Sequence, residues 1–311
     1  MKKVAFIFPG QGSQTVGMGK DFFESSDIAK DMISNASKRL DIDFEKLLFE
    51  ENDNLGKTEF TQPAILLVSC IALELFRSQC DIEPQFVLGH SLGEFSALVA
   101  SGAIDYLDAI ELVHKRGAFM NEACAGAGAG MMALIGLSDE VVEDMTEKLR
   151  EEGKKIWAAN YNMDGQIVVA GIKADLESVV DTFKEAGAKR AIVLDMSVAS
   201  HCELLNSAVD KLNPYLEKFI TDNFKYDVIS NVTAKPYNTK LQAVELLGKQ
   251  LVSPVKYKHS IVENCSELDG MIEFGNGAVL KGMNRKIVKS VPTFNVSDMK
   301  TLTDTLAKLN D

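Results

Sequence analysis

The chain has 311 residues, of which 46% are hydrophobic and 25% charged, and its formal net charge is −12 at pH 7. The composition is that of an ordinary globular protein, and the length fits one elaborated domain or two. The acidic balance argues against nucleic acid and anionic membrane surfaces as partners, and the longest apolar segment, 64–73, is too short to cross a membrane.

Cysteine and histidine side chains are scattered along the chain. The cysteines form no C-x-x-C pair, which is typical of reduced thiols and predicts a cytoplasmic protein. The histidines lie far apart and show no H-E-x-x-H motif, so we expect no bound metal. The cysteines are Cys70, Cys80, Cys124, Cys202 and Cys265, and the histidines are His90, His114, His201 and His259.

The N-terminal segment predicts a strand over residues 3–8 that leads into a glycine-rich loop. The loop lacks the third glycine of a dinucleotide fingerprint and the lysine of a phosphate-binding loop, which argues against a nucleotide site. Its glycines still let a ligand approach the backbone around Gln11. If this strand neighbours the strand before Ser91, the Gln11 amide can serve as an oxyanion donor.

Helices are predicted over 22–40 and 62–76, and the second is apolar nearly all round and therefore buried. After them, an apolar strand from 86 runs into the sequence G-H-S-L-G at 89–93, and a helix pattern follows at once. A G-x-S-x-G motif between a strand and a helix predicts that Ser91 is a nucleophile; the alternative is a serine that only caps the helix. The Leu92 amide at the helix N-terminus is a second candidate oxyanion donor.

The next helix pattern begins near Asp105 and places Arg116 on its apolar stripe. A buried guanidinium needs an anionic partner, since leaving it unpaired would cost several kcal/mol. Two interpretations stay open: a structural salt bridge, or a clamp on the carboxylate of a substrate.

A small-residue linker at 125–130 is followed by a change of pattern. Strands at 131–137, 156–160, 166–170 and 191–195 alternate with helices at 139–152 and 174–186, in the order β-α-β-β-α-β of ferredoxin-like domains. We therefore expect an α/β core with a parallel sheet, formed by 1–125 and 198–311, and an inserted ferredoxin-like subdomain at 126–197.

His201 follows this insert and is the preferred general base for Ser91, although sequence alone leaves four candidates. His90 adjoins Ser91 but is directed away from it by the turn, and Cys202, a rival nucleophile, lacks a strand-to-helix turn. The imidazole needs an orienting partner. Asp195 is one candidate, and the other is a free main-chain carbonyl of Gln250, at the end of a helix from 241.

A strand at 273–274 and a second Gly-x-Gly turn lead into a helix with a local basic run, Lys281, Arg285, Lys286 and Lys289. Such a run is either a solvated helix face or a docking surface.

Five blocks in order, F-P-G-Q-G-S-Q at 8–14, G-H-S-L-G-E at 89–94, Arg116-Gly117, Ser200-His201 and Gln250 before Pro254-Val255, resemble the malonyl-CoA:acyl carrier protein transacylase family. The resemblance spans essentially the whole chain. It departs from the family pattern at Ala199, Tyr257 and Asn276, none of which is a reacting group.

The resemblance implies an α/β-hydrolase-like core and a ping-pong acyl transfer for fatty acid biosynthesis, with malonyl-CoA and acyl carrier protein as partners and no cofactor beyond the coenzyme A thioester. It implies that Ser91 carries the malonyl group, that His201 is general base and acid, and that Arg116 binds the malonyl carboxylate. Gln11 and Leu92 would supply oxyanion amides, and the Gln250 main chain would orient His201.

The carrier is acidic in this family, so we expect it to dock on the basic run, with Lys189 and Arg190 of the insert as further contacts. The alternative function is a serine thioesterase or hydrolase on the same core. Arg116 discriminates between the two, because only a diacid half-thioester needs a cation there.

Overall fold

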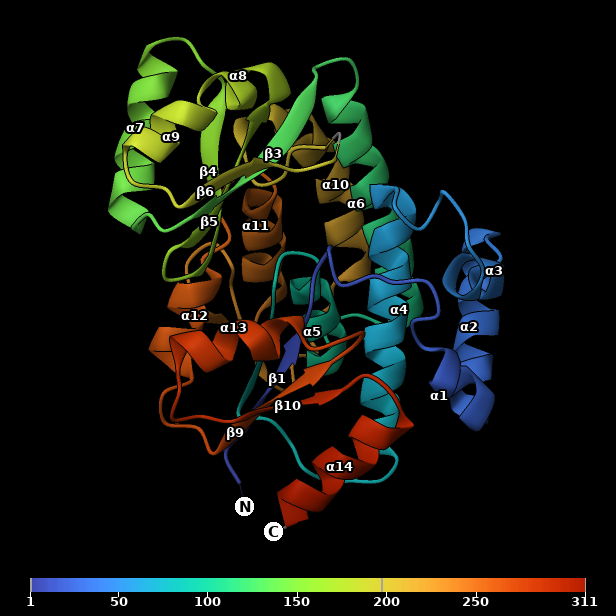
Figure 1. Ribbon diagram of the computed structural model, residues 1–311. Helices are drawn as coiled ribbons and strands as arrows, with labels where there is room; N and C mark the ends of the chain where they lie inside the picture. The colour runs from blue at the N-terminus through green and yellow to red at the C-terminus, as the bar shows by residue number, and fades with distance from the viewer. Residues whose placement is uncertain (1, 197, 311) are drawn as a thin grey trace.

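The strands of the chain form two separate sheets in the computed structural model, which describes residues 2–196 and 198–310 (Figure 1). The larger sheet has the order β10-β9-β1-β2-β7-β8, and all neighbours run parallel except β7 and β8. Its strands are β1 (Val4–Phe8), β2 (Phe86–Gly89), β7 (Asp227–Ile229), β8 (Pro236–Tyr237), β9 (Gly270–Phe274) and β10 (Thr293–Val296).

Strands β1 and β2 lie side by side in the middle of this sheet, with Phe8 paired to Gly89. Both are apolar and almost wholly buried, as expected for parallel strands covered on both faces. Because parallel neighbours end at the same edge, the loops that follow them leave the sheet together. The role predicted for the Gln11 amide requires that the strand before Gln11 neighbour the strand before Ser91, and this pairing is present.

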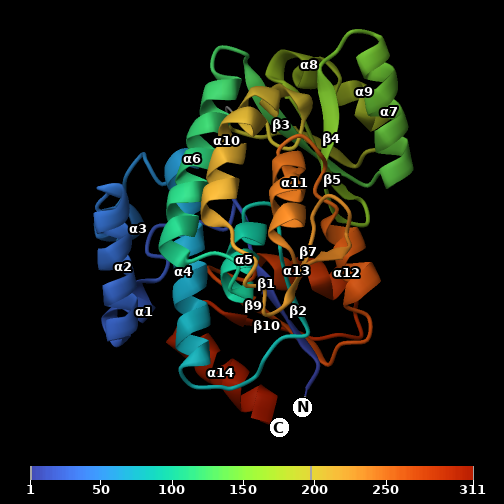
Figure 2. The same cartoon turned by 180° about the vertical axis from the view of Figure 1, so that it is seen from behind.

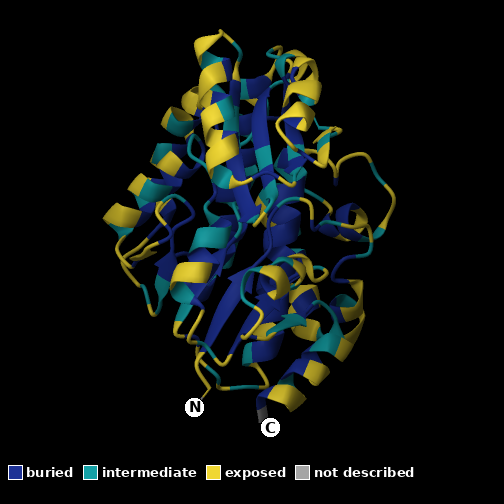
Figure 3. Cartoon of the chain, turned by 60° about the vertical axis from the view of Figure 1, so that its left-hand side comes forward, coloured by how far each residue is buried: buried dark blue, intermediate teal, exposed yellow. Residues whose placement is uncertain are grey.

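Helices cover the larger sheet, and Figure 3 shows the buried strands beneath their exposed outer faces. The central helix α4 (Thr58–Arg77) is apolar and long enough for a membrane span, but 83% of its apolar stretch is buried inside the fold. Helices α2 and α6 pack against α4, and α10 packs against α6 on the side seen in Figure 2. The other helices of this part are α1 (Lys20–Ser25), α2 (Asp27–Leu40), α3 (Phe44–Phe49), α5 (Gly93–Ser101), α6 (Tyr106–Cys124), α10 (Asn206–Phe219), α11 (Lys240–Gln250), α12 (Tyr257–Asn264), α13 (Val279–Ile287) and α14 (Met299–Asn310).

The smaller sheet is antiparallel and has the order β4-β5-β3-β6, the strand order of a ferredoxin-like fold. Its elements are β3 (Ala129–Ile135), α7 (Asp139–Glu151), β4 (Ile156–Met163), β5 (Gln166–Ile172), α8 (Lys173–Ser178), α9 (Val180–Glu185) and β6 (Arg190–Val193). The predicted fold class is confirmed. The division into domains stays a proposal, and its boundary falls on Ser197, which lies outside the described residues.

Strand β4 joins the smaller sheet to the larger part of the molecule. Asn160 forms an isolated parallel bridge with Val255, and the Tyr161 amide donates to the Val255 carbonyl at 2.9 Å. Lys258 of α12 also reaches the insert, with its Nζ 2.6 Å from Asp139 Oδ2 and 3.1 Å from Asp164 Oδ1. The insert is thus fixed to the segment that follows α11.

Some predicted boundaries were wrong. The helix expected over 22–40 breaks at Ser26, whose backbone is extended, and the helix expected over 174–186 breaks at Val179. The strand expected over 131–137 begins at Ala129 and ends at Ile135, because Gly136 has a φ of 104°.

Candidate active site

Ser91 lies on a sharp turn between β2 and α5, with a φ of 52°. Two glycines allow this turn. A Cβ on Gly89 would lie 1.9 Å from the Gly93 carbonyl carbon, and a Cβ on Gly93 would lie 2.1 Å from the Phe8 oxygen. No side chain fits at either position, which is the physical reason for the G-x-S-x-G spacing.

His201 faces Ser91 from the loop after the insert, 110 residues further along the chain. Its Nε2 lies 2.7 Å from Ser91 Oγ, and its Nδ1 lies 2.7 Å from the main-chain oxygen of Gln250. Since a carbonyl can only accept, Nδ1 carries the proton and Nε2 presents a lone pair to the serine hydroxyl. Burial, together with the charge of Arg116, lowers the pKa of His201 to about 3, so the imidazole is neutral near pH 7.

The main-chain oxygen that accepts from His201 lies at the C-terminus of α11, which ends at Gln250 as the sequence predicts. The structure gives no hydrogen bond between Asp195 and His201 among the described residues. Asp195 lines the pocket wall instead.

Arg116 of α6 is 1% exposed and points toward Ser91. Its Nη1 donates to Gln62 Oε1 at 2.9 Å, and its Nη2 donates to Gln250 Oε1 at 3.0 Å and to Ser91 Oγ at 3.4 Å. Gly117 permits this position, because a Cβ there would lie 2.6 Å from the Glu59 Cα of α4. The direct partners are neutral, and the part of the chain that the structure describes offers Arg116 no carboxylate within salt-bridge distance.

The Arg116 guanidinium keeps its charge. Burial lowers its pKa to about 10, while the charge of Glu94 acts in the other direction. The face of the Phe95 ring lies 5.4 Å from the guanidinium carbon and adds a cation–π contact. Its Nε is buried and has no hydrogen-bond partner among the described residues. A buried guanidinium that contacts Ser91 and keeps an unpaired donor is suited to bind an anionic ligand.

Gln11 and Leu92 both line the pocket of about 350 Å³ that contains Ser91, His201 and Arg116. Within residues 2–196 and 198–310, neither main-chain amide donates a hydrogen bond to another residue. Two free amides in the same pocket as the Ser91 hydroxyl are suited to bind an oxyanion. The Gln11 side chain turns elsewhere and donates to Thr58 Oγ1 at 3.3 Å.

His90 and Cys202 are poorly placed for chemistry. His90 Nε2 lies 2.7 Å from Asn162 Oδ1 of β4, so this ring joins the Ser91 turn to the insert. Cys202 is 1% exposed, and burial raises the pKa of its thiol to about 12, which keeps it protonated.

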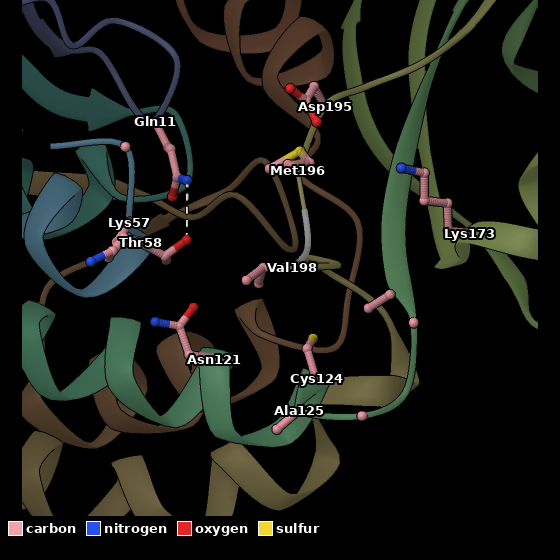
Figure 4. A pocket seen from close by; sticks show the side chains of 14 residues that line it. Gln11, Lys57, Thr58, Asn121, Cys124, Ala125, Lys173, Asp195, Met196 and Val198 are labelled. Carbon is pink, nitrogen blue, oxygen red and sulfur yellow. Dashed lines mark hydrogen bonds between the residues drawn. The ribbon is translucent and has the colours of Figure 1, made fainter. Parts of the chain in front are cut away.

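A second cavity, of about 730 Å³, adjoins the Ser91 pocket and shares Gln11, Gly56, Asp195 and Met196 with it. Figure 4 shows Lys57 and Lys173 on opposite sides of this cavity, with the hydrogen bond from Gln11 to Thr58 on the Lys57 side. Lys57 Nζ donates to Asn54 Oδ1 at 2.7 Å. Lys173 is the first residue of α8 in the insert, and Lys57 directly precedes α4. The cavity therefore separates the insert from the core and carries a cation on each side.

The basic run lies on and just after α13, whose Val279, Leu280 and Met283 line the Ser91 pocket. Helix α13 contacts β4, at one edge of the smaller sheet, whereas Lys189 and Arg190 lie at the start of β6, at the opposite edge. The structure therefore divides the six predicted docking cations into two groups. None of them forms a salt bridge with a described residue.

The three residues that depart from the family pattern are each buried or hydrogen-bonded. Ala199 is fully buried, and the Tyr257 hydroxyl donates to Asn284 Oδ1 at 2.9 Å. Asn276 Nδ2 donates to the Ser13 carbonyl at 2.6 Å, which ties its turn to the loop that holds Gln11.

Sequence reasoning missed Glu94, Asn231 and Asn162, three buried polar residues that contact the turn at 89–93. Glu94 follows Ser91 by three residues, and its place on an otherwise apolar helix was a usable signal. Asn231 donates to the Gly89 carbonyl from 142 residues away, and nothing local in the sequence points to that contact.

Comparison with known proteins agrees with this geometry. The acyl transferase domain family matches residues 5–303. A malonyl CoA-acyl carrier protein transacylase from Bacillus subtilis (strain 168) is 41% identical over 100% of this chain and 99% of its own length. The structure of malonyl-CoA:acyl carrier protein transacylase from Helicobacter pylori matches with a TM-score of 0.97 and 44% identity, covering 100% of this chain and 99% of that one.

A third match is a malonyl-transacylase solved in complex with a type II PKS acyl-carrier protein. It is 34% identical, has a TM-score of 0.92, and covers 98% of this chain and 99% of that one. The full-length agreement in sequence and fold, together with the serine, histidine and arginine in one pocket, leads to one assignment. The chain belongs to the acyl transferase family, among the malonyl CoA-acyl carrier protein transacylases.

Proposed function

We propose that this protein transfers a malonyl group from malonyl-CoA to the phosphopantetheine thiol of acyl carrier protein, by a ping-pong mechanism through a malonyl ester on Ser91. The names of its relatives support this substrate pair. The proposed cycle uses no bound cofactor or metal, and fatty acid synthesis in the cytoplasm is the proposed setting.

In the first half-reaction, Ser91 Oγ attacks the thioester carbon while His201 Nε2, 2.7 Å away, takes the hydroxyl proton. The amides of Gln11 and Leu92 stabilise the oxyanion of the tetrahedral intermediate. The carbon–sulfur bond then breaks, and His201 returns the proton to the sulfur of coenzyme A. Throughout, the Gln250 carbonyl holds the Nδ1 proton and therefore the useful tautomer.

In the second half-reaction, the carrier thiol enters and gives its proton to His201. The thiolate attacks the malonyl ester, Ser91 Oγ leaves, and His201 returns the proton to the serine. Each half-reaction begins and ends with a neutral imidazole, which fits a pKa lowered to about 3.

The observation that carries this proposal is Arg116, a buried cation whose Nη2 lies 3.4 Å from the nucleophile. An acyl chain attached to Ser91 must pass beside this guanidinium. A terminal carboxylate two bonds beyond the ester carbonyl can then bind to it with charge-assisted hydrogen bonds. A thioesterase for uncharged acyl groups would gain nothing from a cation there.

The adjoining cavity provides space for the pantetheine arm of either thioester substrate. Its wall is shared with the Ser91 pocket, so an extended arm in the cavity can deliver its thioester to the serine. Lys57 and Lys173 can contact the phosphates of coenzyme A.

Intact-mass analysis tests the proposal. Mixing the protein with malonyl-CoA should add one malonyl group, which persists without a carrier and moves to holo-acyl carrier protein when that protein is added. The Ser91→Ala variant should stay unmodified. Free malonate formed without any acceptor thiol would instead identify a thioesterase, and absence of the adduct in the unchanged protein would exclude the ester mechanism.

A further inference from the structure

Glu94 is a fully buried carboxylate behind the nucleophile turn, and the proposed mechanism gives it no task. Its Oε1 accepts from the Tyr237 hydroxyl at 3.0 Å. Its Oε2 accepts from Gln250 Nε2 at 2.7 Å and from the Asn231 main-chain amide at 3.1 Å. Three donors therefore reach the carboxylate from β8, from the end of α11 and from the loop after β7.

Two of those partners hold the reacting residues directly. Gln250 accepts from Arg116 through its side-chain oxygen at 3.0 Å, and from His201 through its main-chain oxygen at 2.7 Å. Its Nε2 also donates to the Ser91 carbonyl at 3.1 Å. One residue thus touches all three groups of the proposed mechanism, and Glu94 fixes the orientation of its side chain.

Asn231 holds the other side of the turn. Its Oδ1 accepts from the Ser91 amide at 2.6 Å, and its Nδ2 donates to the Gly89 carbonyl at 2.7 Å. Both polar groups of the Ser91 backbone are therefore bound by residues that Glu94 binds. Because Ser91 has a positive φ, these contacts also help to keep its backbone in a sparsely populated conformation.

The surroundings of the carboxylate suit an ionised acceptor. All the hydrogen-bond partners that the described residues offer it are donors. Burial raises the pKa of Glu94 to about 7, while the three donors and the charge of Arg116 favour the ionised form. A carboxylate that accepts hydrogen bonds from three segments holds these segments in a fixed arrangement, and a side chain too short to bind all three donors cannot do so.

We propose that Glu94 is a positioning residue for acyl transfer: its carboxylate fixes Gln250 and Asn231, and through them it aligns Ser91, His201 and Arg116. This inference rests on the proposed function for its substrate. Its geometric part concerns only the reactivity of Ser91.

Two conservative variants distinguish the contribution of the length of the Glu94 side chain from that of its charge. Glu94→Gln keeps the length of the side chain. Its carbonyl oxygen can accept from Gln250 and Asn231 while its amide donates to the rotatable Tyr237 hydroxyl. Glu94→Asp keeps the charge but is one methylene shorter and cannot hold the same three donors.

For each variant, intact mass follows the rate of malonyl-Ser91 formation at saturating malonyl-CoA. KM for malonyl-CoA and the melting temperature are measured separately. We expect Glu94→Asp to slow acylation at least about tenfold with a smaller change in KM, and Glu94→Gln to stay within about threefold of the unchanged protein. Tyr237→Phe is the matched control. It removes one hydrogen bond to the same carboxylate and leaves the hydrogen bonds to Gln250 and Asn231 in place. It should lower the melting temperature but have little effect on the acylation rate.

The inference is overturned if Glu94→Asp acylates within about twofold of the unchanged protein, or if Tyr237→Phe slows acylation as much as Glu94→Asp. A fluorophosphonate probe for reactive serines provides a second readout that needs no malonyl group. If malonyl-CoA gives no adduct with the unchanged protein, the proposed function fails. The probe still tests the role of Glu94 in that case. Faster labelling of Glu94→Gln than of Glu94→Asp supports the role, and the reverse order or equal rates contradict it.

Discussion

Arg116 Nη2 lies 3.4 Å from Ser91 Oγ, although Arg116 comes from helix α6 and Ser91 from the turn between β2 and α5, 25 positions away. The guanidinium has neutral hydrogen-bond partners, and its Nε finds none within residues 2–196 and 198–310. A buried cation of this kind binds an anion more strongly than a surface cation does, because water does not screen it.

Replacement of this cation should change substrate preference. If Arg116 binds the malonyl carboxylate as proposed, Arg116→Ala removes charge-assisted bonds worth ~1.5–3 kcal/mol, so kcat/KM for malonyl-CoA should fall about 10- to 100-fold. Activity on acetyl-CoA should rise relative to that on malonyl-CoA. Steady-state kinetics with both thioesters measure the ratio, and a variant that still strongly prefers malonyl-CoA would show that the clamp is wrong.

The pH dependence of acylation follows from the buried imidazole. Burial, together with the Arg116 charge, lowers the pKa of His201 to about 3, so the base stays neutral well below the ordinary histidine value. The acylation rate should therefore be nearly flat from about pH 8 down to about pH 5, where a solvent-exposed histidine base would lose most of its activity.

Single-turnover acylation, followed by rapid quench across this range, checks the expectation. A loss of more than about tenfold by pH 5, as for a base with the ordinary histidine pKa of about 6.5, would contradict it. In Arg116→Ala the acid limb should move to higher pH, because a positive charge beside the imidazole has been removed.

Stability should depend on pH through the same side chain. Between the unfolded pKa of about 6.5 and the folded value, only the unfolded chain binds the proton, so stability falls as pH decreases, by up to ~1.4 kcal/mol per pH unit. His201→Gln lacks this contribution. The raised pKa of Glu94 acts with the opposite sign, but it is present in both proteins and cancels in the comparison.

Urea unfolding at several pH values from about 7 to 5 measures this difference. The free energy of unfolding should decline more steeply in the unchanged protein than in His201→Gln. Parallel curves for the two proteins would mean that His201 is not held neutral by the fold.

Charge reversal on α13 should weaken the interaction with the carrier. Arg285 and Lys286 are exposed cations on the helix that lines the Ser91 pocket, and acidic partners associate faster with such surfaces. Arg285→Glu combined with Lys286→Glu should raise KM for acyl carrier protein about tenfold at low salt and leave KM for malonyl-CoA unchanged. Equal effects on both substrates would argue against this surface.

Lys189 and Arg190 provide the matched comparison, because they lie at the other edge of the smaller sheet. Reversal of these two charges tests whether the carrier docks on α13 alone or is attracted by both groups of cations. The same loss of carrier affinity would place the carrier across both groups.

The cavity between core and insert predicts a further kinetic effect. Lys57→Ala and Lys173→Ala each remove a cation from its wall, so KM for malonyl-CoA should rise several-fold while the rate at saturation stays unchanged. The same assay with a malonyl thioester that lacks the nucleotide is the control. Equal losses with both thioesters would show that the lysines do not contact phosphates.

Local sequence rules were sufficient to predict the nucleophile turn and the order of strands in the insert. The turn at Ser91 is set by short-range sterics, since backbone of Gly93 and Phe8 occupies the space that side chains at 89 and 93 would need. The strand order of the insert follows from a β-α-β-β-α-β pattern that few topologies satisfy.

Contacts between distant segments could not be predicted in this way. Glu94 meets Gln250 from 156 residues away, and Asn231 meets Ser91 from 140, so no periodicity or spacing encodes either pair. The separation of Lys189 and Arg190 from α13 likewise depends on which strand lies at which edge. Breaks at Ser26 and Val179 escaped because the hydrophobic pattern continues across them.

The left-handed backbone at Ser91 has a consequence for attempts to engineer this protein. For any residue except glycine, that conformation costs ~1–3 kcal/mol, and the rest of the fold must absorb the strain. Selection for heat resistance alone will therefore favour glycine at position 91, where the strain vanishes together with the hydroxyl. Libraries screened for durability need a simultaneous assay of turnover, or they will enrich robust but inert molecules.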